Sequence, residues 1–158
     1  MLLARHADRQ TLILGVYVEH LRALAAAIDA PFICGETSQP KREELYAAFR
    51  RGELRTLVVS RVGSFALDLP TASVGIEVSG TFGSRQEEAQ RLGRILRPKD
   101  ETVHFYTVVS DDTVEVDFAL RRQRFLAEQG YRYRVETAAA QPAVQPPGSP
   151  SPPSGDPG

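Results

Sequence analysis

The chain has 158 residues, 42% of them hydrophobic, which suffices for one domain with its own apolar core. Its formal net charge is −1, so the overall charge does not attract nucleic acid, and any site for a polyanion must be local. The single cysteine excludes a disulfide framework and a multi-cysteine zinc site, and it fits a reducing cytoplasm. The chain shows neither a signal peptide at its start nor the ~18 consecutive apolar residues of a membrane span. We therefore expect a soluble intracellular protein of the cytoplasm that makes no membrane contact.

Short apolar runs alternate with helical patterns before the C-terminal segment. The apolar runs predict strands over residues 11–16, 31–34, 56–60, 73–79 and 103–109. Helical spacing predicts helices over residues 18–28, 37–49, 84–96 and 113–129. Residues 131–135 are a further strand candidate. Strands that are apolar throughout and alternate with helices indicate an α/β fold, in which helices flank a mainly parallel sheet on both faces.

The composition changes in the last part of the chain. Residues 138–158 hold most of the eleven prolines and no aromatic residue, so this segment cannot bury enough surface to offset its ordering entropy. We predict a folded domain over residues 1–136 and a disordered Pro/Gly/Ser-rich tail over 137–158. Recognition of the tail by a polyproline-binding partner is the alternative.

The helix expected over residues 84–96 carries the first candidate site. Gln90, Arg94 and Arg97 stand at i, i+4 and i+7, so they share one helical face. Two guanidinium groups on one face suit phosphate oxygens, which they bind bidentately at any relevant pH. Gly93 costs about 1 kcal/mol in a helix relative to alanine, and close approach of a ligand or another chain would justify it. The alternative is a solvated helix whose arginines pair with neighbouring glutamates.

Ligands of a parallel sheet bind beyond the carboxyl ends of its strands, which directs attention to the loops after Val16, Cys34 and Ser60 and to the helix near Arg94. Two of these loops carry candidate site residues. In the loop over residues 60–70, which passes through Gly63, the side chains of Ser60 and Ser64 and the backbone amides can face a phosphate. Asp68 can accept from a hydroxyl or pair with an arginine. The alternative is a plain connection in which Asp68 is a turn residue.

The second loop lies between a strand and a helix N-terminus. Gly35, Thr37 and Ser38 occupy this place, where free amides and the helix dipole favour an anion, and Arg42 can contribute. Capping of the helix by the Thr37 or Ser38 side chain is a compatible alternative. Cys34 has no adjacent basic partner and is interpreted as a small buried apolar group.

Several familiar site patterns are missing from the sequence. Neither lysine belongs to a G-x-x-x-x-G-K-[ST] phosphate-binding loop, and no acidic pair suited to magnesium follows a strand. His6, His20 and His104 lack metal-binding spacing, so we predict no metal site, and we expect His20 and His104 to be surface or packing residues.

Three segments, in this order, resemble the second RecA-like lobe of superfamily 2 helicases. "TLILGVYVEHL" with "CGETSQ" is similar to motifs IV and IVa, "LVVSRVGSFALDLP" to motif V, and "QRLGRILR" to motif VI. The particular branch resembled is that of the XPB-type DNA repair helicases, because the likeness extends over residues 11–135 and includes "RRQRFLAEQGYRYRV". The resemblance implies a RecA-like three-layer domain.

The resemblance also implies roles at the nucleotide. Arg94 and Arg97 would be arginine fingers that reach the γ-phosphate of ATP, and Gln90 would position the attacking water or sense that phosphate. Gly63 and Asp68 would belong to the nucleotide-binding residues, with Asp68 at the ribose or at the interface between lobes. Many members have Gly-x-Asp in motif V where this chain has Ala-Leu-Asp, which weakens the assignment of the aspartate.

For DNA, the resemblance implies that Gly35, Thr37 and Ser60 contact the phosphate backbone without reading sequence. ATP and Mg²⁺ would be held mainly by a first RecA-like lobe, whose phosphate-binding loop this chain lacks. We therefore expect the chain to act as the C-terminal lobe of an ATP-dependent 3′–5′ DNA helicase and to be inactive alone, as a fragment or the product of a truncated gene. A repair nuclease or transcription and repair factors are further expected partners. The alternative is a truncated, non-catalytic interaction module.

Overall fold

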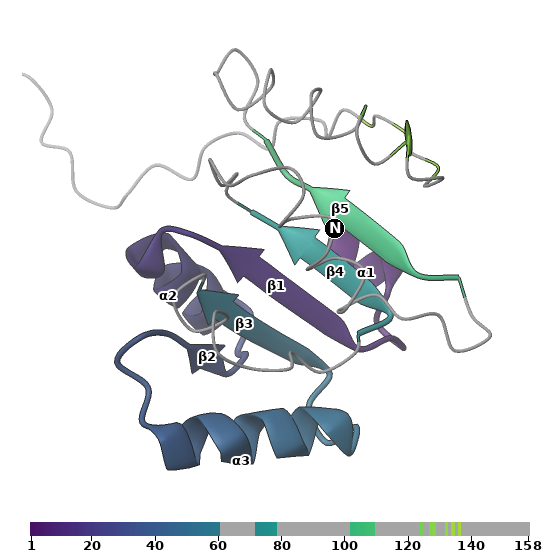
Figure 1. Ribbon diagram of the computed structural model, residues 1–158. Coiled ribbons are helices and arrows are strands. Elements are labelled where there is room, and N and C mark those ends of the chain that lie inside the picture. The colour runs from purple at the N-terminus through teal and green to yellow at the C-terminus, as the bar shows by residue number, and fades with distance from the viewer. Residues whose placement is uncertain are drawn as a thin grey trace, which may run out of the picture.

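The computed structural model describes residues 1–60, 72–78 and 102–109, together with the single positions 124, 127, 128, 132, 134 and 136. The helices of the described part are α1 (Leu2–Arg5), α2 (Val18–Ala27) and α3 (Gln39–Arg50). Its strands are β1 (Thr11–Gly15), β2 (Phe32–Ile33), β3 (Thr56–Ser60), β4 (Val74–Glu77) and β5 (His104–Thr107) (Figure 1).

The strands form one sheet in the order β2-β3-β1-β4-β5, and every neighbouring pair is parallel. The central strand β1 lies between β3 and β4, with Leu12 opposite Leu57 on one side and opposite Gly75 on the other. The parallel sheet predicted from the alternation of apolar runs and helices is thereby confirmed. All five carboxyl ends consequently lie along the same edge of the sheet, which Figure 1 shows as the edge to which the arrowheads point.

Side chains on the two faces of the sheet make two separate apolar clusters. On one face α3 packs against the strands, and the buried residues there are Leu12, Ile33, Tyr46, Phe49, Leu57, Val59 and Ala72. On the other face α2 and α1 cover the strands, and the buried residues are Ile13, Leu21, Ala25, Val58, Val74 and Ile76. Successive residues of a strand point to opposite faces, so the apolar runs of β1 and β3 fill both clusters. The described part is therefore a helix–sheet–helix arrangement of three layers.

Strand β2 is shorter than the sequence predicts, and its neighbours explain why. The strand was expected over residues 31–34 but covers only Phe32 and Ile33. Pro31 has no amide proton and contributes only its carbonyl oxygen, which accepts from Val58 at 3.0 Å. The Cys34 amide donates to the Thr37 side chain, so it is not available to a neighbouring strand.

Helix α3 has a well-defined C-terminal stop. Gly52 has φ +78°, its amide donates to the Phe49 carbonyl, and the Glu53 amide donates to the Ala48 carbonyl, both at 3.0 Å. This pair of bonds is the Schellman arrangement, which satisfies two carbonyl groups that the helix itself leaves free. The left-handed backbone at this position favours glycine.

Other predictions have mixed outcomes. The helices expected over 18–28 and 37–49 are found as α2 and α3, whereas the short helix α1 was not predicted. Arg124, Ala127 and Glu128 have helical backbone, in agreement with the helix expected over 113–129. Arg132 and Arg134 lie outside any strand, so the last strand is absent at these two positions. The helix expected over 84–96 and the tail 137–158 lie outside the described residues. Within the described part, no helix is long and apolar enough to cross a membrane.

Candidate functional site

The ends of the central strands bring polar groups to the carboxyl edge of the sheet. Ser60 ends β3 opposite Gly15 of β1, and Glu77 ends β4 opposite Leu14 of β1 and Thr107 of β5. Ser60 is fully buried, Glu77 is 6% exposed, and neither side chain is without a partner. Two polar residues, Ser60 and Glu77, are therefore buried at the carboxyl ends of β3 and β4.

A tight turn over residues 35–37 stands at the end of β2 on the same edge. The Cys34 amide donates to the Thr37 hydroxyl oxygen at 3.0 Å, and the Thr37 amide donates back to the Cys34 carbonyl at 3.2 Å. Because the hydroxyl oxygen accepts this bond, its own proton remains to donate, and the Cys34 sulfur at 3.8 Å is only a weak acceptor for it. Gly35 is exposed and Thr37 is half-buried, so the turn lies at the surface.

The backbone of this turn is polarised by Arg42, one turn into α3. Its Nη2 atom donates to the carbonyl oxygens of Cys34 at 3.1 Å and Thr37 at 3.3 Å. The carbonyls at both ends of the turn are thus held towards the helix, while no described residue accepts a hydrogen bond from the Gly35 or Glu36 amide. The sequence suggested Arg42 as a possible anion ligand, whereas in the structure its guanidinium binds the backbone carbonyls of the turn. Its Nε atom is buried and has no partner among the described residues.

The N-terminus of α3 adjoins the turn, and in its first turn the amides of Gln39 and Lys41 have no side-chain cap, whereas Pro40 between them has no amide proton. Ser38 is the N-cap residue, yet no side chain caps the helix, so the predicted capping by Thr37 or Ser38 is wrong. The reason at Thr37 is that its oxygen is already engaged with the Cys34 amide. Lys41 in the first turn pairs with Glu44 at 2.9 Å, which offsets one of the two carboxylates that follow. Uncapped amides and the helix dipole together favour an anion here.

The helix α2 is linked to the 35–37 turn by Arg22. This guanidinium contacts the Glu36 carboxylate at 3.4 Å and the Glu19 carboxylate at 3.7 Å, and it stacks over the Phe32 ring at 5.5 Å. Tyr17, which precedes α2 at the end of β1, is 53% exposed. The Tyr17 and His20 rings lie 5.7 Å apart.

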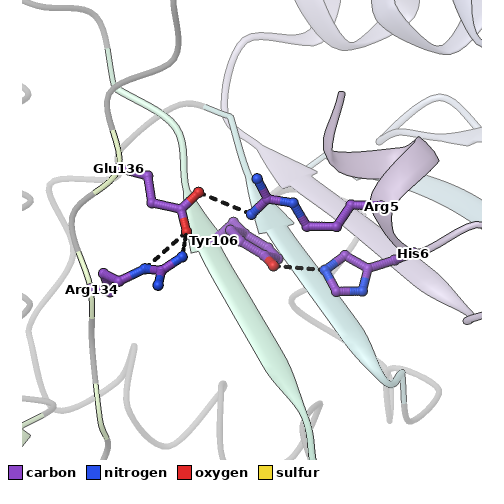
Figure 2. Close-up of polar contacts among 5 residues, drawn as sticks. All are labelled: Arg5, His6, Tyr106, Arg134 and Glu136. Atoms are coloured by element: carbon purple, nitrogen blue, oxygen red, sulfur yellow. Dashed lines mark hydrogen bonds and ion pairs between the residues drawn. The ribbon is translucent and has the colours of Figure 1, made fainter.

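A second polar cluster joins α1 to β5 (Figure 2). The His6 Nε2 atom and the Tyr106 hydroxyl are 2.6 Å apart, and Arg5 donates to the Glu136 carboxylate at 2.9 Å. Arg134 binds the same carboxylate through its Nε atom at 3.0 Å. These hydrogen bonds, Arg134 first and then Arg5, lower the pKa of Glu136. The cluster anchors the start of the chain to the sheet edge formed by β5.

His6 and His104 have packing roles. His6 is buried and its ring lies 4.9 Å from that of His104. Burial lowers the pKa of His6, and the charges of His104, Arg9 and Arg5 lower it further. His20 is a surface residue, as expected. Among the described residues, no group of three His, Cys, Asp or Glu side chains could hold a metal ion.

Of the residues expected at the site, the structure places Gly35, Thr37 and Ser60 on one edge. Gly35 and Thr37 share the turn, and Ser60 lies buried beneath the strand ends. The remaining expected residues, Gly63, Asp68, Gln90, Arg94 and Arg97, lie outside the described residues.

Sequence reasoning missed two features of this edge. The clamp by Arg42 joins a side chain to backbone carbonyls, a contact for which residue spacing gives no signal. The loop after Val16 was among the places where the topology predicts a ligand, but the exposed aromatic residue there, Tyr17, was not singled out.

Comparison with known proteins identifies the family. A family profile described as ERCC3/RAD25/XPB C-terminal helicase matches residues 2–147. A protein named "DNA 3′–5′ helicase XPB" from Kineococcus radiotolerans is 59% identical over 139 residues, which cover 87% of this chain and 25% of the relative. Its namesake from Mycobacterium tuberculosis is 56% identical with the same coverage. The chain thus spans about a quarter of the length of these relatives.

The fold has counterparts among solved structures. The C-terminal domain of the DEAD-box protein Dbp5 superposes with a TM-score of 0.63 at 16% sequence identity, and the match covers 76% of this chain and 71% of that domain. At this identity the likeness concerns the fold, and it confirms the RecA-like architecture expected from the motifs. With the profile matching nearly the whole chain, this protein belongs to the ERCC3/RAD25/XPB C-terminal helicase family.

Proposed function

We propose that this chain is the C-terminal motor lobe of an ATP-dependent 3′–5′ DNA helicase of the DNA repair type. The observation that carries the proposal is the family match over residues 2–147, together with relatives that are named DNA 3′–5′ helicases. Such a lobe forms one wall of a cleft whose other wall is a first RecA-like lobe. ATP binding closes the cleft and hydrolysis opens it, so the two lobes advance along one strand.

The contacts to the DNA strand come from the turn over residues 35–37. The Thr37 hydroxyl and the Gly35 amide are donors without a strong acceptor among the described residues, and phosphate oxygens are suitable acceptors. The Arg42 clamp and the uncapped end of α3 support an anion at this place. Ser60 is fully buried, so Gly35 and Thr37 are the better supported of the three proposed backbone contacts.

The contacts to ATP belong to the motif VI and motif V residues. In this proposal Arg94 and Arg97 supply positive charge to the γ-phosphate, Gln90 orients the attacking water or senses that phosphate, and Gly63 and Asp68 contribute at the nucleotide. The support is their spacing in the sequence and the family match. The sequence contains no phosphate-binding loop, and the described residues offer no magnesium site, so ATP and Mg²⁺ would be held mainly by the first lobe.

Reconstitution tests the proposal. The chain is mixed with a separately expressed first lobe that carries the phosphate-binding loop and the acidic motif, and DNA-stimulated ATP turnover is measured. We expect neither part alone to turn over ATP, and the mixture to do so. Replacing Arg97 by alanine should reduce the restored turnover ~10³-fold or more, as for other arginine fingers.

A matched control is available at Arg51. This arginine is exposed at the C-terminal end of α3, where it pairs with Glu53 at 2.6 Å, away from the proposed site. Arg51→Ala should leave turnover unchanged. Unchanged turnover in Arg97→Ala would refute the finger assignment. If no first lobe restores turnover or DNA binding, the chain is a non-catalytic interaction module.

The partners follow from the same proposal. A first RecA-like lobe and DNA are required by the mechanism. A repair nuclease or transcription and repair factors, and a location in the cytosol or at the nucleoid, are proposed for the whole protein.

A further inference from the structure

Tyr17 is an unusual surface residue. Among the described residues only three large hydrophobic side chains are exposed, Met1, Tyr17 and Val108, and Tyr17 is the aromatic one. It follows β1, the central strand of the sheet, and so stands at the middle of the carboxyl edge. A single exposed hydrophobic residue needs no explanation by itself. The surroundings of Tyr17 supply one.

The ring of Tyr17 contacts a residue from the first turn of α2, the helix that follows it. The His20 ring lies 5.7 Å away, centroid to centroid, and is tilted by 59°. A tyrosine side chain has only two rotatable bonds, and the His20 contact restricts them further. A ring restricted before binding loses less conformational entropy when a ligand stacks on it.

The charges near Tyr17 are already paired. Arg22 contacts both Glu19 and Glu36, and the latter lies in the turn proposed to hold a DNA phosphate. Two carboxylates thus face one guanidinium, so the group has no net positive charge to attract a second phosphate, and the chemistry that remains is the flat aromatic surface. The planar face of a base is the part of a nucleic acid that suits such a surface.

We propose that Tyr17, oriented by His20, stacks on a nucleobase of the DNA strand whose backbone is held by the 35–37 turn. The inference rests on the proposed DNA contact of this lobe and adds a base contact to it. Stacking tolerates every base, because every base has a π-face, and it is thus compatible with movement along any sequence.

Two oligonucleotides of equal length and charge test the proposal. One is an ordinary single strand, and the other carries abasic sites at every position, so that phosphates remain and bases are absent. Binding to the chain combined with a first lobe is measured by fluorescence anisotropy. Tyr17→Ala should weaken binding of the ordinary strand between about 5-fold and 150-fold and leave the abasic strand unchanged. Tyr17→Phe should bind as the original chain does.

Three controls separate the possible results. Val108→Ala removes another exposed hydrophobic side chain at the same edge and should change neither affinity. His20→Ala should show a smaller loss than Tyr17→Ala, confined to the ordinary strand. Thr37→Val should weaken both strands equally, because it removes a phosphate contact.

The outcomes are distinct for the two proposals. If Tyr17→Ala weakens both strands equally, or neither, base stacking is refuted while the backbone contact stands. If Thr37→Val leaves both affinities unchanged, the backbone contact fails at that residue. If the original chain with its first lobe binds neither strand, both proposals are wrong.

Discussion

Arg42 is the residue whose replacement should most directly reveal how the 35–37 turn is held. Its guanidinium donates to the Cys34 carbonyl at 3.1 Å and to the Thr37 carbonyl at 3.3 Å. In Arg42→Ala the Thr37 carbonyl loses this donor, whereas the Cys34 carbonyl keeps the bond from the Thr37 amide. The turn should therefore loosen without unfolding the sheet.

The size of the effect follows from three contributions. A hydrogen bond from a charged group stabilises by about 1.5–3 kcal/mol, and we count the 3.1 Å bond fully and the longer bond at about half that value. Removing the side chain also removes a buried Nε without a partner among the described residues, which returns about 1–3 kcal/mol. The net loss of unfolding free energy is about 1–2 kcal/mol, or roughly 4–8 °C in Tm.

Thermal unfolding followed by circular dichroism measures this loss, with Lys41→Ala as the matched control. Lys41 lies in the same helical turn but pairs only with Glu44 on the surface, and such exposed pairs contribute about 0–1 kcal/mol. Arg42→Ala should lower Tm clearly more than Lys41→Ala. Equal shifts for the two variants would show that the clamp does not hold the turn.

Three further predictions concern the described part of the domain. Phe49→Ala, at a fully buried position of α3, should lower the unfolding free energy in urea by about 3–5 kcal/mol, and a loss below 1 kcal/mol would contradict the assigned core. Gly52→Ala should cost about 1–2 kcal/mol through its left-handed backbone alone, since a Cβ atom meets nothing within 4 Å; an unchanged stability would contradict the stop of α3. In the folded chain the pKa of His6 is lowered, first by burial and then by the charges of nearby groups. The contribution of His6 to folding stability is therefore fully present above its pKa in the unfolded chain, about 6.5, and is lost as the pH drops through the lowered pKa of the folded chain. Urea unfolding at pH 7.5 and 5 should show this loss, His6→Gln should show less of it, and equal pH dependence in both chains would refute the assignment.

The strands could be predicted from the sequence because both faces of a parallel sheet are buried. Continuous apolar runs therefore predict β1, β3 and β4 without knowledge of their neighbours in the fold. Both ends of β3 were predicted correctly. The end of β2 depends instead on a hydrogen bond from the Cys34 amide to the Thr37 side chain. Apolar periodicity carries no information about such a bond.

Contacts between distant residues were beyond sequence reasoning for a related reason. The four residues of α1 are too few for a helical period, and their place is set by packing of Leu2 and Leu3 on the sheet. The His6–Tyr106 contact joins residues a hundred positions apart. At the candidate site, loop positions were predicted from topology, while the role of Arg42 depends on where its guanidinium points, which only the folded chain shows.

The proposed contacts to DNA share one physical property that a translocating lobe requires. A hydroxyl, a backbone amide and a helix N-terminus each recognise phosphate, which repeats at every nucleotide, so a step of one nucleotide restores the same set of contacts. Each contact must also break at every step, which favours neutral donors such as those of Gly35 and Thr37 over a cluster of arginines at this edge. The two arginines near this turn agree with this requirement, because Arg22 pairs with the Glu36 carboxylate and Arg42 donates to the Cys34 carbonyl. A base stacked on Tyr17 would add affinity for the strand without adding sequence preference. The free energy of ATP hydrolysis would then be needed only for the movement of the lobes.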